Sequence, residues 1–235
     1  VTITNPTPRS YIGGLIGYAN SWTSRYERLY ATGDVTISNG TADYVGGLIG
    51  YFRGGYLENS YASGNVSGVR NSSGALVGLH RGDTRGSFAT GDISASGRNI
   101  SALIGYQLEG SITDSFSTGD VEADGSAGGI VGYLNSTVTD SVTDVYAHGV
   151  VTQNSGSSFD PIMMGAVVGE ELNAGSLSTT QSFYIQENRD ASFNTLGSAL
   201  SLASANSAGN YTSFDFVSNP GWRVPNPGYE LEGYG

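Results

Sequence analysis

The sequence predicts an all-β protein, a parallel β-helix (β-solenoid) with about one rung for each repeat of roughly 27 residues. Three observations predict this fold. Two short motifs alternate along the chain with one shared period, strand-forming runs of four to six residues end at glycines, and no apolar pattern follows the 3.6-residue period of a helix. Glycine provides 36 of the 235 residues and cysteine none, so backbone pairing between rungs is expected to stabilise the fold without disulfides.

The first motif is a small residue, two aliphatic residues and a glycine. Its six copies close at glycines that are 33, 28, 27, 27 and 37 residues apart. Stacked rungs place equivalent residues above one another, so the first aliphatic residues are predicted to form one interior ladder. These residues are Leu15, Leu48, Leu76, Leu103, Ile130 and Val167.

The second motif falls between copies of the first and begins with an aromatic residue. Its five copies start at Tyr30, Tyr61, Phe88, Phe116 and Tyr146, which are predicted to form a second interior ladder. After the motif glycine comes a column of acidic or amide residues, Asp34, Asn65, Asp92 and Asp120. We expect these side chains to cap local backbone amides; calcium binding is the alternative, and no other cofactor is expected.

These two motifs resemble the GLUG repeat, which is named for its Gly-Leu-aliphatic-Gly core. The repeat occurs in bacterial and archaeal adhesins and in immunoglobulin A peptidase-like surface proteins. The resemblance covers about residues 1–184 and implies an extracellular β-helical module without implying a particular reaction. Residues 185–235 resemble the segment that follows such arrays, and we expect an irregular capping or association segment there, with a short helix over Ser198–Asn206.

The two ends of the chain are candidates for association. Residues 1–3 align with residues 35–37, so the chain begins inside a repeat. This alignment predicts either a trimmed fragment of a longer array or a first rung that packs on another molecule. An uncovered rung is an open sheet edge, which favours association. The association candidates are Val1, Ile3, Ile12, Trp222 and Tyr229.

Two groups of side chains are candidates for ligand contact. Tyr18, Tyr51, Tyr106 and Tyr133 follow the first motif, and outward-facing rings there would stack on the faces of sugars. Alternation does not determine whether these rings face inward or outward. The second group lies in an insertion over Asn20–Leu29, which we expect to be a loop on a rigid scaffold; its candidates are Trp22, Arg25, Tyr26 and Arg28.

Six Asn-x-Ser/Thr sequons make N-glycosylation a further expectation, provided that the source glycosylates its surface proteins. They begin at Asn39, Asn65, Asn71, Asn99, Asn135 and Asn210.

Charge and composition exclude several classes of partner and reaction. The net charge is −11 and all ten basic residues are arginine, which argues against nucleic acid, and no apolar run approaches the length of a membrane span. The two histidines, His80 and His148, lie in different motifs without an acid and a nucleophile beside them, so we expect no enzyme. A solenoid enzyme would have to use Glu170 with Glu171, or Asp83 with Arg81 and Arg85.

The sequence therefore predicts a non-catalytic extracellular module, structural or adhesive, of a cell-surface protein. Its expected partners are cell-surface glycans or other copies of itself. The first alternative is a fibre subunit that stacks end to end through its terminal rungs, and the second is a β-helical carbohydrate-active enzyme.

Overall fold

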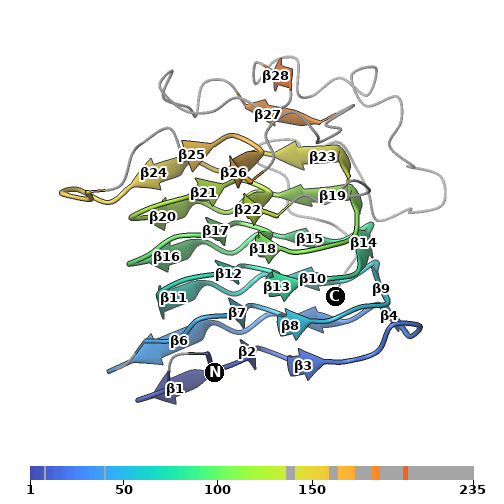
Figure 1. Ribbon diagram of the computed structural model, residues 1–235, viewed down its shortest axis with the longest axis horizontal. Coiled ribbons are helices and arrows are strands. Elements are labelled where there is room, and N and C mark those ends of the chain that lie inside the picture. Colours follow the sequence, from blue (N-terminus) through green and yellow to red (C-terminus); the bar gives the residue numbers. More distant parts are fainter. Residues whose placement is uncertain are drawn as a thin grey trace.

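The computed structural model is a β-solenoid, as the sequence predicts (Figure 1). It describes residues 1–7, 9–39, 41–135, 141–158, 164–172, 182–185 and 198–200. Within these ranges every regular element is a β-strand, and no helix is long and apolar enough to cross a membrane. The strands form four parallel sheets, which we name A to D.

Sheets A, B and C each contain six strands, one from each rung. Sheet A comprises β1 (Thr2–Thr4), β6 (Val35–Ser38), β11 (Val66–Val69), β16 (Ile93–Ala95), β20 (Val121–Ala123) and β24 (Val151–Gln153). Sheet B comprises β2 (Ile12–Gly13), β7 (Val45–Gly46), β12 (Ser73–Gly74), β17 (Ile100–Ser101), β21 (Ala127–Gly128) and β25 (Met164–Gly165). Sheet C comprises β3 (Ile16–Ala19), β8 (Ile49–Phe52), β13 (Val77–His80), β18 (Ile104–Gln107), β22 (Val131–Leu134) and β26 (Val168–Glu171).

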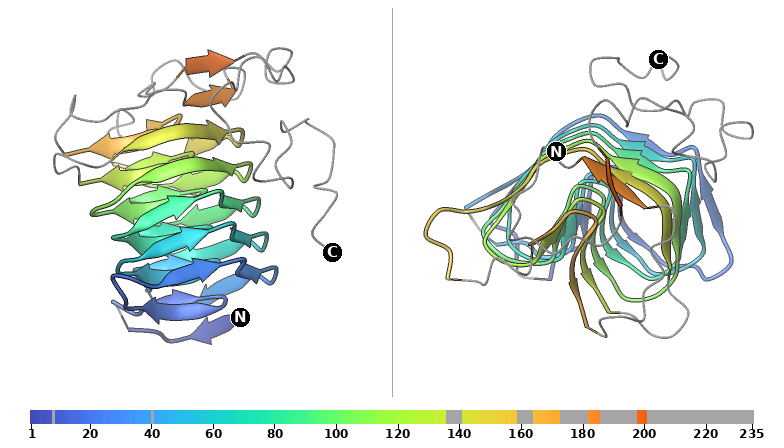
Figure 2. Two further views of the ribbon diagram at one scale, coloured as in Figure 1. Left: turned by 90° about the vertical axis from the view of Figure 1, so that its right-hand side faces the viewer. Right: turned by 90° about the horizontal axis from the view of Figure 1, so that it is seen from above.

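Sheet D has ten strands because its lower rungs contribute two strands each. The outer set comprises β4 (Arg25–Glu27), β9 (Tyr56–Glu58) and β14 (Asp83–Arg85), and the inner set β5 (Tyr30–Ala31), β10 (Tyr61–Ala62) and β15 (Phe88–Ala89). The two sets merge in β19 (Ile112–Ser117) and β23 (Val142–Ala147), which are followed by β27 (Phe183–Ile185) and β28 (Ser198–Leu200). Seen along the axis, successive rungs lie almost directly over one another (Figure 2).

The interior is filled by two apolar clusters, one between sheets C and D and one between sheets A and B. The predicted aliphatic ladder is confirmed. Leu48, its equivalent Leu103 and the other ladder members in the higher rungs have no exposed surface. Leu15 is 50% exposed because it lies in the first rung, at the open end of the stack.

The predicted aromatic ladder is confirmed as a stack, and its upper members are buried as predicted: Phe88, Phe116 and Tyr146 are 7%, 4% and 1% exposed. Tyr61 is partly buried and Tyr30 is 61% exposed, and none of the five rings belongs to the two core clusters. Tyr61 and Phe88 lie parallel with ring centroids 5.0 Å apart, and Phe88 and Phe116 follow at 4.8 Å. The neighbouring alanines, such as Ala62 and Ala89, occupy the core instead, and adjacent residues of a strand point to opposite faces. The aromatic rings therefore face away from the core and cover one another along the axis.

The region after residue 184 differs from the expectation of an irregular segment with a short helix at its start. Ser198–Leu200 forms strand β28, which pairs in parallel with β27 and so continues sheet D. The rest of the expected helix, together with the association candidates Trp222 and Tyr229, lies outside the described residues.

Candidate functional site

The tyrosine column lies on the outer face of sheet C. Tyr18 is in register with Tyr51, and Tyr106 with Tyr133, while Leu79 occupies the rung between these pairs. Phe52, which directly follows Tyr51 in β8, belongs to the core cluster, whereas none of the four tyrosines does. Adjacent residues of a strand point to opposite faces, so the rings point outward. The structure thereby decides the direction that alternation in the sequence left open.

The first two rungs gather four tyrosines, Tyr11, Tyr18, Tyr44 and Tyr51, into one cluster. The Tyr11 ring centroid lies 5.4 Å from that of Tyr18, 5.5 Å from that of Tyr44 and 5.2 Å from that of Tyr51. Tyr11 and Tyr18 are 43% and 42% exposed, whereas their neighbours reduce Tyr51 to 8%. Sequence reasoning missed Tyr11 and Tyr44, although both precede an aliphatic residue and a glycine at equivalent places of the repeat.

Two arginines border this cluster. Arg53 donates to the Tyr18 hydroxyl at 3.2 Å and to Asn20 Oδ1 at 3.4 Å. Arg81 donates to Glu109, which raises the pKa of the guanidinium, and its Cζ lies 6.0 Å from the ring centroid of Trp22. Trp22 is 55% exposed.

We call these residues the tyrosine–arginine surface: Tyr11, Tyr18, Trp22, Tyr51, Arg53 and Arg81.

The tyrosine–arginine surface combines two chemistries that suit a sugar ligand. Exposed ring faces stack on the apolar faces of sugars, and guanidinium groups donate paired hydrogen bonds to hydroxyls and carboxylates. Arg53 forms no ion pair within the described part of the chain, so its charge is free to meet an acidic group. Arg81 is already held by Glu109 and is better suited to orienting Trp22.

The insertion over residues 20–29 is only partly a loop. Arg25–Glu27 forms strand β4 in register with β9, and Tyr26 packs partly buried against the core with its ring edge-on to Phe52. The expectation that Tyr26 contacts a ligand stays a prediction, and it now applies to a partly buried ring. Arg25 pairs with Glu58 and lies over the Tyr56 ring, so Arg25 and the exposed Arg28 belong to sheet D rather than to the tyrosine–arginine surface.

Comparison with known proteins gives a solved structure of similar fold and a partial sequence match to one curated protein. No family model matches the chain, so the GLUG resemblance has no support from that source. A stretch of 78 residues, 32% of this chain, is 39% identical to halomucin from Haloquadratum walsbyi, of which it spans only 1%. The crystal structure of a proposed immunoglobulin A1 protease from Bacteroides ovatus superposes with a TM-score of 0.60 over 88% of this chain and 74% of that one, at 16% identity. This likeness shows a shared fold.

The column of acidic and amide residues caps backbone amides, as predicted, but these amides belong to the next rung rather than to the local turn. Oδ1 of Asp34 accepts the N–H of Asn65 at 2.8 Å, and Oδ1 of Asp92 accepts the N–H of Asp120 at 2.8 Å. Asn65 and Asp120 act in the same way on the next rung. Among the described residues, no group of three or more histidine, cysteine or acidic side chains is arranged to hold a metal ion.

The sequon asparagines fall into different environments. Asn39 and Asn65 are exposed, whereas Asn71, Asn99 and Asn135 are partly buried. Two residues of the Asn135 sequon, and the whole of that at Asn210, lie outside the described residues.

The residues that an enzyme would use are dispersed. His80 points into the core, where burial lowers its pKa to about 3, and its Nε2 hydrogen-bonds to Oγ1 of Thr84 at 2.8 Å. Arg81 and Arg85 are paired with Glu109 and Asp114 rather than with Asp83. Oδ1 of Asp83 instead accepts the backbone N–H of Ser111. Glu170 and Glu171 follow one another on β26, at the Tyr133 and Leu134 positions of the columns.

The first rung presents an open edge. Within the described ranges, β1 to β5 each pair with the second rung alone. Val1 is 55% exposed and Tyr30 61%, while the association candidates Ile3 and Ile12 pack partly buried against the cluster between sheets A and B. The edge therefore exposes apolar side chains together with unpaired backbone groups.

Proposed function

We propose that this chain is a non-catalytic β-solenoid module of an extracellular protein, and that its tyrosine–arginine surface binds acidic glycans. The observation that carries the proposal is the position of Arg53, which forms no ion pair with another described residue, beside the exposed rings of Tyr18 and Tyr11. The repeats build a rigid stack on which this surface is held in place by backbone pairing. The match to halomucin supports an extracellular setting, because mucins are extracellular proteins.

The charge of the molecule favours an acidic rather than a neutral ligand at this position. The chain carries −11 overall, and Arg53, like Arg9 and Arg98, forms no ion pair within the described ranges. A carboxylate-bearing sugar would receive a charge-assisted hydrogen bond from Arg53 while its ring stacks on Tyr18 or Trp22.

A glycan array that contains matched neutral and acidic oligosaccharides tests the proposal. Arg53→Ala and Trp22→Ala are each expected to weaken binding about tenfold, which corresponds to about 1.4 kcal/mol. The matched controls are Arg28→Ala and Tyr56→Ala, which remove an exposed arginine and an exposed tyrosine from sheet D. Equal losses in all four variants, or no binding to any acidic glycan, would contradict the proposal.

A second candidate function is a fibre subunit that stacks end to end, which exposed apolar side chains of the first rung, such as Leu15, would favour. Leu15 is half exposed there, although its equivalents in the higher rungs are fully buried. Light scattering over a range of concentrations and negative-stain electron microscopy test this candidate. Filaments of constant width that disappear in Leu15→Arg would support stacking, and monomers at every concentration would exclude it.

A further inference from the structure

A groove of about 570 Å³ runs along the outer face of sheet A, where each second-motif turn meets the following strand. Two rows of polar side chains line it at rung spacing. The first row is the capping column, Asp34, Asn65, Asp92 and Asp120, and the second is Thr36, Ser67, Ser94, Glu122 and Thr152. The groove therefore has two rows of polar side chains, and Val66, Ile93, Val121 and Val150 complete its lining.

Asn65 differs from the aspartates of the capping column in its side-chain nitrogen, Nδ2, which makes no contact that the fold needs. Its Oδ1 accepts the N–H of Asp92 at 2.9 Å, the same capping bond that the aspartates make. Its Nδ2 forms no hydrogen bond to any described residue, so capping does not require an asparagine here. Asn65 also begins an Asn-Val-Ser sequon, and Ser67 lines the same groove two residues further on.

We propose that Asn65 is an N-glycosylation site and that the first sugars of its glycan lie in this groove. In the transfer, Nδ2 bonds to the anomeric carbon of a lipid-linked oligosaccharide. The bond from that carbon to the donor's phosphate oxygen breaks, the phosphate leaves with the electron pair, and Nδ2 loses one proton. The capping oxygen of Asn65 is untouched by this step. Asp34, Asp92 and the hydroxyl row then accept hydrogen bonds from the sugar hydroxyls on either side.

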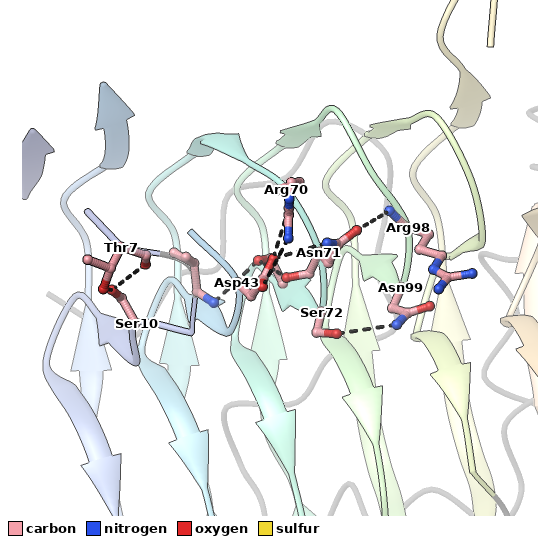
Figure 3. A network of polar contacts seen from close by, with 10 residues as sticks. Thr7, Ser10, Asp43, Arg70, Asn71, Ser72, Arg98 and Asn99 are labelled. Atoms are coloured by element: carbon pink, nitrogen blue, oxygen red, sulfur yellow. Dashed lines mark hydrogen bonds and ion pairs between the residues drawn. The ribbon is translucent and has the colours of Figure 1, made fainter. Parts of the chain in front are cut away.

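At Asn71 and Asn99, by contrast with Asn65, the side-chain nitrogen is occupied by a hydrogen bond (Figure 3). Nδ2 of Asn71 donates to Oδ1 of Asp43 at 3.1 Å, and Nδ2 of Asn99 donates to the Ser72 hydroxyl at 3.2 Å. Their side-chain oxygens are occupied as well, by the N–H of Arg98 and the hydroxyl of Ser126.

The hydroxyl residues of these two sequons are also inaccessible. Ser73 and Ser101 have no exposed surface, whereas Ser67 is partly exposed and lines the groove. A sugar on Asn71 or Asn99 would separate stacked rungs, so folded protein is expected to carry none at either position.

This inference shares the extracellular setting of the proposed function but uses a different face and different residues. The test is glycopeptide mass spectrometry of the full chain secreted from a host with N-glycosylation. We expect a glycan on Asn65 in most molecules and none on Asn71 or Asn99. An unmodified Asn65, or folded protein with a glycan on Asn71 or Asn99, would overturn the proposal whatever the glycan array shows.

Three variants sharpen the measurement. Asn65→Asp and Ser67→Ala should each remove one glycan mass, and Asn65→Asp should keep the melting temperature because aspartate already fills this position in three other rungs. Ser94→Ala is the matched control, since Ser94 is the register partner of Ser67 but belongs to no sequon. A Ser67→Ala protein that keeps its glycan mass would also overturn the proposal.

Discussion

Oδ1 of Asp92 accepts the backbone N–H of Asp120, which lies one rung further along the solenoid, at 2.8 Å. Asp92 in turn donates its own N–H to the side chain of Asn65 in the preceding rung. The capping column is therefore a continuous chain of side-chain-to-backbone bonds along the axis. Each bond satisfies an amide at a turn, where no strand partner is present.

Replacement of Asp92 by alanine should remove one link of this chain. The N–H of Asp120 would lose its partner, and we expect the free energy of unfolding to fall by about 1 kcal/mol. Asp92→Asn keeps the accepting oxygen and should be nearly neutral, as at Asn65. Urea unfolding of both variants measures the difference. Equal destabilisation by both would assign the effect to charge rather than to capping.

Above the first rung, the second-motif glycines are required by contact with the preceding rung. A Cβ at Gly91 would overlap the carbonyl oxygen of Gly64 in the preceding rung, so Gly91→Ala should destabilise the protein by about 2 kcal/mol or more. Gly33 holds the same place in the first rung, where a Cβ would meet nothing within 4 Å. Gly33→Ala should therefore be tolerated. Thermal unfolding of the pair tests the prediction, and similar melting temperatures would refute it.

The position of a leucine along the interior ladder should determine the cost of its truncation. Leu103 is fully buried, and Leu103→Ala should cost about 2–5 kcal/mol of unfolding free energy. Leu15→Ala removes a half-exposed side chain of the same column and should cost less than about 1 kcal/mol. Chemical unfolding at low protein concentration measures both. A large cost at Leu15 would mean that the first rung is covered in solution.

Burial of His80 should make stability depend on pH. Its pKa is lowered to about 3, while in the unfolded chain it is about 6.5. Between these values the unfolded chain binds a proton that the folded protein does not, so this group lowers stability by about 1.4 kcal/mol for each unit that the pH falls. Above about pH 7 the histidine is neutral in both the folded and the unfolded chain, and it no longer lowers stability.

The variant His80→Leu isolates this dependence. Leucine already occupies the same column at Leu134, two rungs further on, and it does not titrate. The unfolding free energy of the variant should fall less steeply than that of the wild type between about pH 6 and pH 4. Parallel slopes would show that His80 is accessible to protons in the folded state.

Much of the fold could be predicted because each rung of a solenoid repeats the same strands and turns. The spacing of the closing glycines predicts which residues become register partners, and pairs such as Leu48 and Leu76 follow directly from it. The capping role of Asp34 and Asp92 was predictable for the same reason, since both follow a turn glycine at one place of the repeat.

The candidate site was only partly predictable. Tyr18 and Trp22 were identified from the sequence, but Tyr11, Arg53 and Arg81 lie elsewhere in the repeat and join them only through stacking of the rungs. The strand at Tyr26 was not predicted because its neighbours look like an insertion, whereas backbone pairing with β9 turns the Tyr26 ring toward Phe52.

The sequence by itself determined the period, the columns and the chemistry that each column repeats. The tertiary structure decided the direction of each column. Tyr61 and Ala62 are adjacent in one short strand, and their sequence motif fits either face. The core accepts the alanine because the facing glycine, Gly47, leaves room for a methyl group and for little more. Packing across the interior, which local sequence does not encode, thus placed the rings on the face of sheet D that points away from the two core clusters.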